Sequence, residues 1–195
     1  MPGPVTHVAA MSAAVKIINE KHKLNLKTGN YLQNMIPDTQ GPHGFDFKKT
    51  KQGSIILKIT NEYYELVRSF KEKNHAKINQ NIRNLCHYLV DAHTIGQISS
   101  EFHGKIDSRI DFFSEFVWEK NKYNSIPIKP HSIEHLKYRI YTSMEWVYHS
   151  CKEKAGSWMF IFSRDLLHMV RNAVEKGVVY TAAAVDLAIR EAKNA

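Results

Sequence analysis

Apolar residues recur every three or four positions along most of this chain, and no other sequence feature constrains the fold as strongly. In residues 7–21 this spacing places Met11, Val15 and Ile18 on one helical face, with Thr6 as the expected N-cap. No segment shows the alternation of apolar and polar residues that is typical of a half-buried strand. The sequence therefore predicts an all-α chain that folds as a multi-helix bundle.

Further helices are expected wherever the same spacing returns, and glycine and proline mark the breaks between them. The expected ranges are 54–73, 76–95, 99–122, 132–152, 158–175 and 178–193. Residues 23–51 are rich in glycine and proline, and we expect them to form a long loop of the kind that often carries function. Gly177 is expected to separate the last two helices, because glycine weakens a helix.

The size and charge of the chain limit its organisation and its partners. It has 195 residues, of which 43% are hydrophobic, and it contains no internal repeat, so we expect a single domain over residues 1–195. The formal net charge of +8 favours anionic partners such as phosphate esters, nucleic acid or an acidic lipid surface. The lysines form no dense run, which indicates a general positive field more than a dedicated nucleic-acid patch.

The sequence has no segment with the pattern of a membrane anchor. The first residues show no basic leader and no apolar stretch long enough for a signal peptide, and the most apolar run, residues 158–162, is too short to cross a bilayer. We therefore expect no transmembrane segment, a cytoplasmic location and at most transient contact with a membrane surface. The two cysteines, Cys86 and Cys151, have no metal-finger spacing and imply no disulfide.

Two histidine-aspartate pairs carry the chemistry that the sequence indicates. His87 precedes Asp91 by four residues, and His103 precedes Asp107 by the same interval. Residues four apart on a helix lie about one turn from each other, so both side chains of a pair can bind one cation. Apolar neighbours around the first pair indicate a buried helix, in which ionisable groups must be paired or ligated. The alternative interpretation is a histidine-aspartate hydrogen bond in the core.

Candidate metal ligands occur in four places along the chain. They are His7 at the first helix, Asp38 and His43 in the long loop, His87 with Asp91, and His103 with Asp107. Imidazole and carboxylate ligands suit zinc, although manganese, iron or nickel would accept the same donors. Several carboxylates close together would repel one another, and cations would remove that penalty.

These residues resemble the zinc-dependent phospholipase C family, which shares its helical fold with the S1/P1 nucleases. The resemblance is carried by residues 2–7, 36–38, 85–91 and 102–107, and it extends over most of the chain. It implies a single zinc-dependent phospholipase C-like domain, a bundle of the phospholipase C/P1 nuclease type, and two or three bound zinc ions. It also implies an enzyme, a phosphoric diester hydrolase acting on a phospholipid head group or a nucleic acid.

The resemblance also implies a role for each candidate ligand. His7 would bind one zinc, Asp38, His43 and His87 a second, and His103 with Asp107 a third, while Asp91 would bridge the first two ions. The ions would polarise the phosphoryl oxygens and activate a water for in-line attack. Asp38 or a metal-bound hydroxide would serve as the catalytic base.

The chain departs from the family pattern at several positions. The family usually has a histidine six residues after the bridging aspartate, and Gln97 occupies that position here. His93 lies two residues after Asp91 and points away from the site on a regular helix, so it can replace that ligand only where the backbone bends. Asp107 stands where a glutamate is more usual.

Three other functions remain open from the sequence. An S1/P1-like single-strand nuclease would need aromatic stacking surfaces, which Tyr31, Phe45 or Phe47 would supply. A non-catalytic helical module with an incomplete metal site is favoured by Gln97. A zinc protease is suggested by residues 131–135, which match the pattern H-x-x-E-H, although little chain follows that motif.

Overall fold

The computed structural model of the chain describes residues 4–30, 33, 54–93, 128–151 and 164–194. Helices in these ranges are α1 (Pro4–His22), α3 (Ser54–Lys71), α4 (His75–Ala92), α6 (Ile133–Cys151) and α7 (Arg164–Lys193). The described ranges contain no strand, which confirms the all-α prediction for this part of the chain. The helix expected over 99–122 and most of the expected loop over 23–51 lie outside the described residues.

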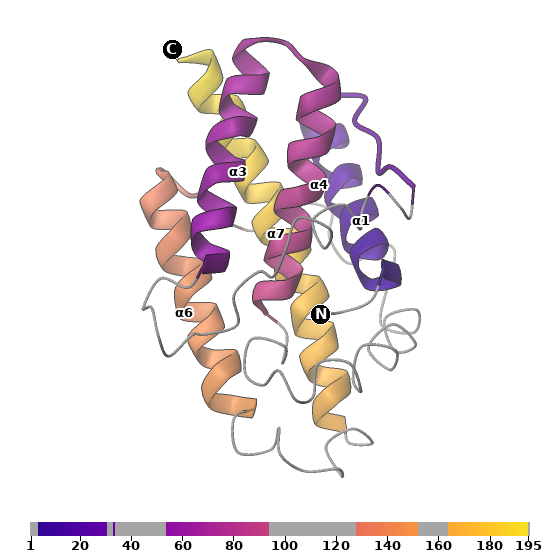
Figure 1. Cartoon of the computed structure of the whole chain (residues 1–195), viewed down its shortest axis with the longest axis vertical. Coiled ribbons are helices and arrows are strands. Elements are labelled where there is room, and N and C mark those ends of the chain that lie inside the picture. Colours follow the sequence, from indigo (N-terminus) through magenta and orange to yellow (C-terminus); the bar gives the residue numbers. More distant parts are fainter. Residues whose placement is uncertain (1–3, 31–32, 34–53, 94–127, 152–163, 195) are drawn as a thin grey trace.

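Helix α7 lies in the middle of the bundle and contacts each of the other four described helices (Figure 1). It can approach them closely because a run of small residues, Ala182, Ala183 and Ala184, is fully buried along it. Helix α1 is also buried over most of its surface, as is typical of a helix that is apolar nearly all round. The five helices share one hydrophobic core, to which Ile18, Ile59, Leu85, Leu136 and Val185 each contribute from a different helix.

Helices α3 and α4 form an antiparallel hairpin, and their boundaries follow from the turn between them. Lys73 adopts a φ of 54°, the left-handed conformation that commonly ends a helix. Asn74 then caps α4, since its side chain accepts a hydrogen bond of 3.1 Å from the backbone N–H of Lys77. The two helices therefore match the expected ranges of 54–73 and 76–95 to within a few residues at each end.

The expected break at Gly177 is wrong, because α7 continues through this residue over 30 residues. Gly177 is required for packing instead of for a turn. A Cβ at this position would come within 2.3 Å of Val90 Cγ2 on α4, far inside normal van der Waals contact. The absence of a side chain thus allows α4 and α7 to pack closely at the end of α4 that carries Asp91.

The expected N-cap of the first helix is also wrong. Helix α1 begins at Pro4, so Thr6 lies inside its first turn and is fully buried. Proline suits this position because its fixed φ matches the helix and the first turn does not need its N–H as a donor. Within the described ranges, none of the helices combines the length and apolar character that a membrane span requires.

Candidate metal centre

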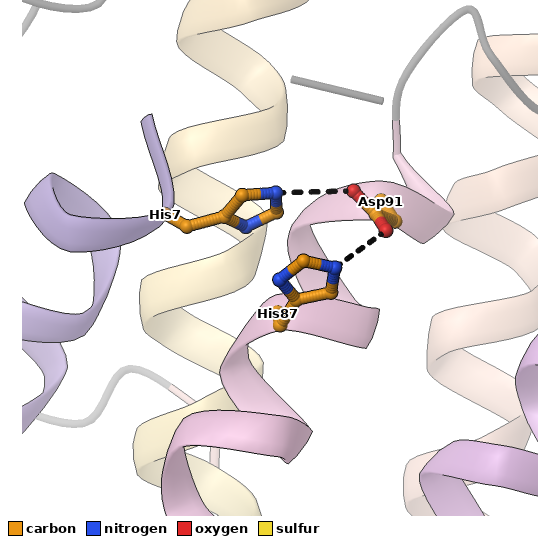
Figure 2. A group of neighbouring side chains, drawn as sticks. All are labelled: His7, His87 and Asp91. Atoms are coloured by element: carbon orange, nitrogen blue, oxygen red, sulfur yellow. Dashed lines mark ion pairs between the residues drawn. The ribbon is translucent and has the colours of Figure 1, made fainter. Parts of the chain in front are cut away.

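Two helices bring together His7, His87 and Asp91, three of the residues that the sequence indicated as ligands (Figure 2). His87 and Asp91 lie one turn apart on α4, as their four-residue spacing predicts. His7 comes from the first turns of α1, and it reaches the pair because α1 packs against α4. The group therefore combines a local helical pair with a ligand from a distant part of the sequence.

Each imidazole faces a different oxygen of the same carboxylate. His7 Nε2 lies 3.3 Å from Asp91 Oδ1, and His87 Nε2 lies 3.2 Å from Asp91 Oδ2 (Figure 2). The two imidazole rings are stacked, with their centroids 3.9 Å apart and their planes inclined by 13°. The side chains thus converge on one small volume beside the carboxylate.

All three side chains are buried, with exposed fractions of 1% for His7 and His87 and 0% for Asp91. Burial alone would raise the pKa of the Asp91 carboxyl group, but attraction to His87 and His7 and hydrogen bonds with both hold this pKa well below its usual range. Asp91 therefore remains a carboxylate inside the core. A buried negative charge of this kind requires compensation by a cation or by strong hydrogen bonding.

The donor set fits a transition metal such as zinc. Donor atoms of the three residues lie within 4.8 Å of one another, and no other three-ligand group occurs in the described ranges. Bonds of about 2.0–2.1 Å in tetrahedral geometry place neighbouring donors about 3.3 Å apart. The two distances to Asp91 are close to this value. Two imidazoles and a carboxylate are also a ligand combination found at catalytic zinc sites.

The remaining candidate ligands lie outside the described residues. They are Asp38, His43, His103 and Asp107, and Gln97 lies outside as well. Their predicted roles, including Asp38 as catalytic base and His103 with Asp107 at a third ion, therefore stay predictions.

His93 lies apart from the group of His7, His87 and Asp91, as its two-residue spacing from Asp91 indicated. It caps the C-terminal end of α4 and donates its Nδ1–H to the Leu89 carbonyl oxygen over 2.7 Å. Its ring is stacked on Tyr180 of α7, with the centroids 5.5 Å apart. Complete burial lowers the pKa of His93 to about 4, so the imidazole is neutral near pH 7.

The H-x-x-E-H motif at residues 131–135 does not form a zinc-protease arrangement. His131 and His135 contact each other through their Nδ1 atoms, 2.8 Å apart. Glu134 is 70% exposed and forms an ion pair with Lys137. The motif belongs to the start of α6, and its residues form part of no three-ligand group in the described portion of the chain.

A cluster that the sequence analysis missed surrounds Asp186 on α7. Its Oδ1 lies 2.6 Å from Lys21 Nζ and 3.0 Å from His22 Nε2, and its Oδ2 lies 3.4 Å from Arg190 Nε. Burial raises the pKa of Asp186, but these neighbours outweigh it and lower the pKa below the usual range. The cluster fastens the C-terminal end of α1 to α7. Lys21 and Asp186 are 165 positions apart, so no local pattern could have indicated the contact.

No family model matches this chain, and no curated protein or solved structure is significantly similar to it.

Proposed function

We propose that the chain is a metal-dependent phosphodiester hydrolase of the zinc-dependent phospholipase C type, with a bundle of the phospholipase C/P1 nuclease kind. The observation that carries this proposal is the buried convergence of His7, His87 and Asp91 from two helices. Two stacked imidazoles around a buried carboxylate form a compact donor set, and a divalent cation would satisfy it.

A divalent ion bound here would supply a Lewis acid that polarises a phosphoryl oxygen and lowers the pKa of a water molecule. His7, His87 and Asp91 would hold this ion. Asp91 directs one oxygen toward each imidazole, so its carboxylate could serve as a ligand beside either histidine. The low pKa of Asp91 keeps it deprotonated, so its ligation needs no loss of a proton near neutral pH.

The net charge of the chain supports an anionic substrate. A formal charge of +8 attracts phosphodiesters in general, and both candidate substrates, a phospholipid head group and a nucleic acid, are phosphodiesters. The phospholipase activity follows the resemblance of the metal-ligand motifs. The S1/P1-like nuclease is the alternative hydrolase, because it uses the same metal chemistry on a different diester.

Complete burial of the three side chains favours a second candidate, a non-catalytic helical module with a structural metal site. Structural zinc sites are closed by protein ligands, whereas catalytic sites keep a position open to water or substrate. An ion at this place would hold α1 against α4 and stabilise the bundle in either case. Both the hydrolase and the structural module would bind metal, but only the hydrolase would turn over a substrate. A turnover assay therefore distinguishes them.

The first experiment measures the metal content of protein purified without added metal. Elemental analysis should find about two or three zinc ions per chain if all the predicted ligands bind, and about one if only His7, His87 and Asp91 bind. The second experiment compares three substrates, namely a chromogenic phosphodiester, phosphatidylcholine vesicles and single-stranded DNA. Hydrolysis of the lipid supports the phospholipase, and hydrolysis of DNA supports the nuclease.

His87→Ala is the decisive variant, and His75→Ala is its matched control, because His75 is an exposed histidine at the other end of the same helix. His87→Ala should lose bound metal and all turnover, whereas His75→Ala should keep both. Protein that binds metal and hydrolyses none of the three substrates supports the structural site. Absence of bound metal, or unchanged turnover in His87→Ala, would contradict the hydrolase.

A further inference from the structure

A groove separate from the metal centre lies between α6 and α7. Its volume of about 470 Å³ falls within the range of about 300–1,000 Å³ that is typical of small-molecule sites. On α6 it is lined by Tyr138, Arg139 and Trp146, and on α7 by Asn172 and Lys176. Among the described residues, no acidic side chain and none of the metal-centre residues line it. We call this feature the α6–α7 groove.

Among the described residues, the groove carries two positive charges without an acidic partner. Arg139 and Lys176 both line it, and neither forms an ion pair with any residue in the part of the chain that the structure describes. Two cations without a carboxylate between them attract anions and can donate charge-assisted hydrogen bonds to phosphate oxygens. The groove is therefore suited to an anionic ligand.

The groove also offers aromatic surfaces to solvent. Tyr138 is 68% exposed and Trp146 is 61% exposed, which is unusual for side chains of this size. They lie eight residues apart on α6 and share a face with Thr142, so they flank the groove about 12 Å apart along the helix. Exposed aromatic rings beside cations favour ligands with a flat π-system, such as a nucleobase.

The base of the groove is fixed by Tyr180, which is only 3% exposed. Its hydroxyl group donates a hydrogen bond of 3.0 Å to the backbone oxygen of Arg139, and its ring is stacked on His93. Asn172 adds a polar group, since its Nδ2 is buried and has no acceptor among the described residues. The groove thus combines a fixed floor with an amide donor that a ligand can satisfy.

The direction of the helices determines which groups share an end of the groove. Helices α6 and α7 run antiparallel (Figure 1), and the contact of Tyr180 with Arg139 fixes their register. Trp146 follows Arg139 by seven residues and Asn172 precedes Tyr180 by eight, so both lie roughly 10–12 Å from this contact. Trp146 and Asn172 therefore share one end of the groove, Arg139 lies at the other, and Lys176 lies between them.

We propose that the α6–α7 groove binds a nucleotide unit, an aromatic base joined to a phosphate, either as a free nucleotide or as part of a single strand. The base stacks on Trp146, and the amide of Asn172 donates to an acceptor on its edge. The phosphate pairs with Lys176 and Arg139. This assignment uses no residue of the metal centre, so it stands whether or not the chain is a hydrolase.

The test uses isothermal titration calorimetry on the full chain as purified, so that any metal ion that stabilises the fold stays bound. Phosphate that binds through such an ion is recognised because its affinity does not depend on Trp146 or Lys176. The titrants are AMP, adenosine, inorganic phosphate and a single-stranded DNA of about ten nucleotides. AMP should bind at least about tenfold more tightly than adenosine or phosphate, because neither of these engages both ends of the groove. Trp146→Ala and Lys176→Gln should each weaken AMP binding by at least about tenfold.

Two substitutions on α3 serve as matched controls. Tyr64→Ala removes an aromatic ring that is 53% exposed, and Lys71→Gln removes an exposed lysine, both away from the groove. Neither should change AMP affinity. Because Trp146 is itself exposed, Trp146→Ala should keep the far-UV circular dichroism of the parent, which shows that any loss of binding is local.

The strand and the free nucleotide are distinguished by their affinities. A strand that binds more than about tenfold tighter than AMP, and depends on Trp146, identifies single-stranded nucleic acid as the ligand. Equal or weaker binding of the strand identifies the free nucleotide. The proposal is overturned if neither AMP nor the DNA strand binds at about 5 mM. It is also overturned if Trp146→Ala and Tyr64→Ala bind AMP with equal affinity.

Discussion

Gly177→Ala tests the close approach of α4 and α7, near the end of α4 that carries His87 and Asp91. The new Cβ would lie 2.3 Å from Val90 Cγ2, whereas carbon atoms in contact are about 3.5–4.0 Å apart. About 1.5 Å of overlap must therefore be relieved. Valine in a helix strongly prefers one χ1 rotamer, so the side chain cannot simply rotate away and the two helices must separate.

Two opposing terms determine the size of the effect. Alanine is favoured over glycine in a helix interior by about 1 kcal/mol, which would stabilise the variant. Overpacking a core costs about 1–3 kcal/mol, and more where a stiff side chain blocks relaxation. We expect the steric term to dominate and to lower the free energy of unfolding by about 2 kcal/mol, or the Tm by about 4–8 °C for a chain of this size.

A double-mutant cycle with Val90→Ala identifies the cause. Val90→Ala alone should cost about 2 kcal/mol, because it removes two buried methyl groups and leaves a cavity. In the double variant the methyl group added at position 177 occupies part of that cavity, so the combined cost should fall below the sum by about 1.5 kcal/mol or more. Urea denaturation followed by far-UV circular dichroism measures all four free energies.

The reasoning is refuted if Gly177→Ala is as stable as the parent, or if the two substitutions are additive. The same variants report on the metal centre, because Val90 directly precedes Asp91 on α4. Displacement of this turn should weaken zinc binding in Gly177→Ala, and Val90→Ala should restore part of the affinity.

Three further predictions concern buried ionisable groups. The pKa of His93 is lowered to about 4, so the unfolded chain binds a proton below about pH 6.5 that the folded chain does not. The metal-free protein should therefore lose up to about 3 kcal/mol of stability between pH 6.5 and 4, and urea titrations of His93→Gln should show a smaller loss. Burial raises the pKa of the Cys86 thiol to about 12, so Cys86 should react with a thiol reagent only when the protein unfolds. The measurement uses a Cys151→Ser background, in which Cys86 is the only thiol. Rapid labelling of the native protein would contradict the burial of Cys86. The lowered pKa of Asp186 stabilises the fold above about pH 4, and this contribution is lost as the pH falls toward the pKa of the folded state. Asp186→Asn should accordingly lower the free energy of unfolding by about 1–2 kcal/mol at neutral pH, because solvent around Lys21 screens part of the interaction. In thermal melts at about pH 3, the difference in Tm between the variant and the parent should be smaller.

Local spacing predicted the extents of α3, α4 and α6 to within a few residues. The boundary between α3 and α4 depends on Asn74 as a cap and on the conformation of Lys73, and both act within one turn. Gly177 misled the prediction because a glycine that allows a close helix crossing looks the same in a sequence as one that ends a helix. The difference lies in Val90, a residue on another helix.

The same distinction applies to the candidate site. The pairing of His87 with Asp91 follows from one helical turn and could be predicted from spacing alone. The position of His7 depends on how α1 packs against α4, so its residue type suggested a ligand but its spacing did not. The contacts of Asp186 with Lys21 and His22 gave no local signal, because these partners on α1 lie at the opposite end of the sequence. Only its pairing with Arg190, four residues later on α7, follows from helical spacing.

The central position of α7 affects how the chain can fold while a ribosome is still making it. The four other described helices precede α7 in the sequence, and each of them packs against it. Until α7 has been synthesised, their apolar surfaces lack the one described helix that contacts all of them, and nascent chains with exposed apolar surfaces are prone to aggregate or to bind chaperones. His7 and His87 would both be made before α7, yet the core that holds α1 and α4 in place would close only after translation has passed α7.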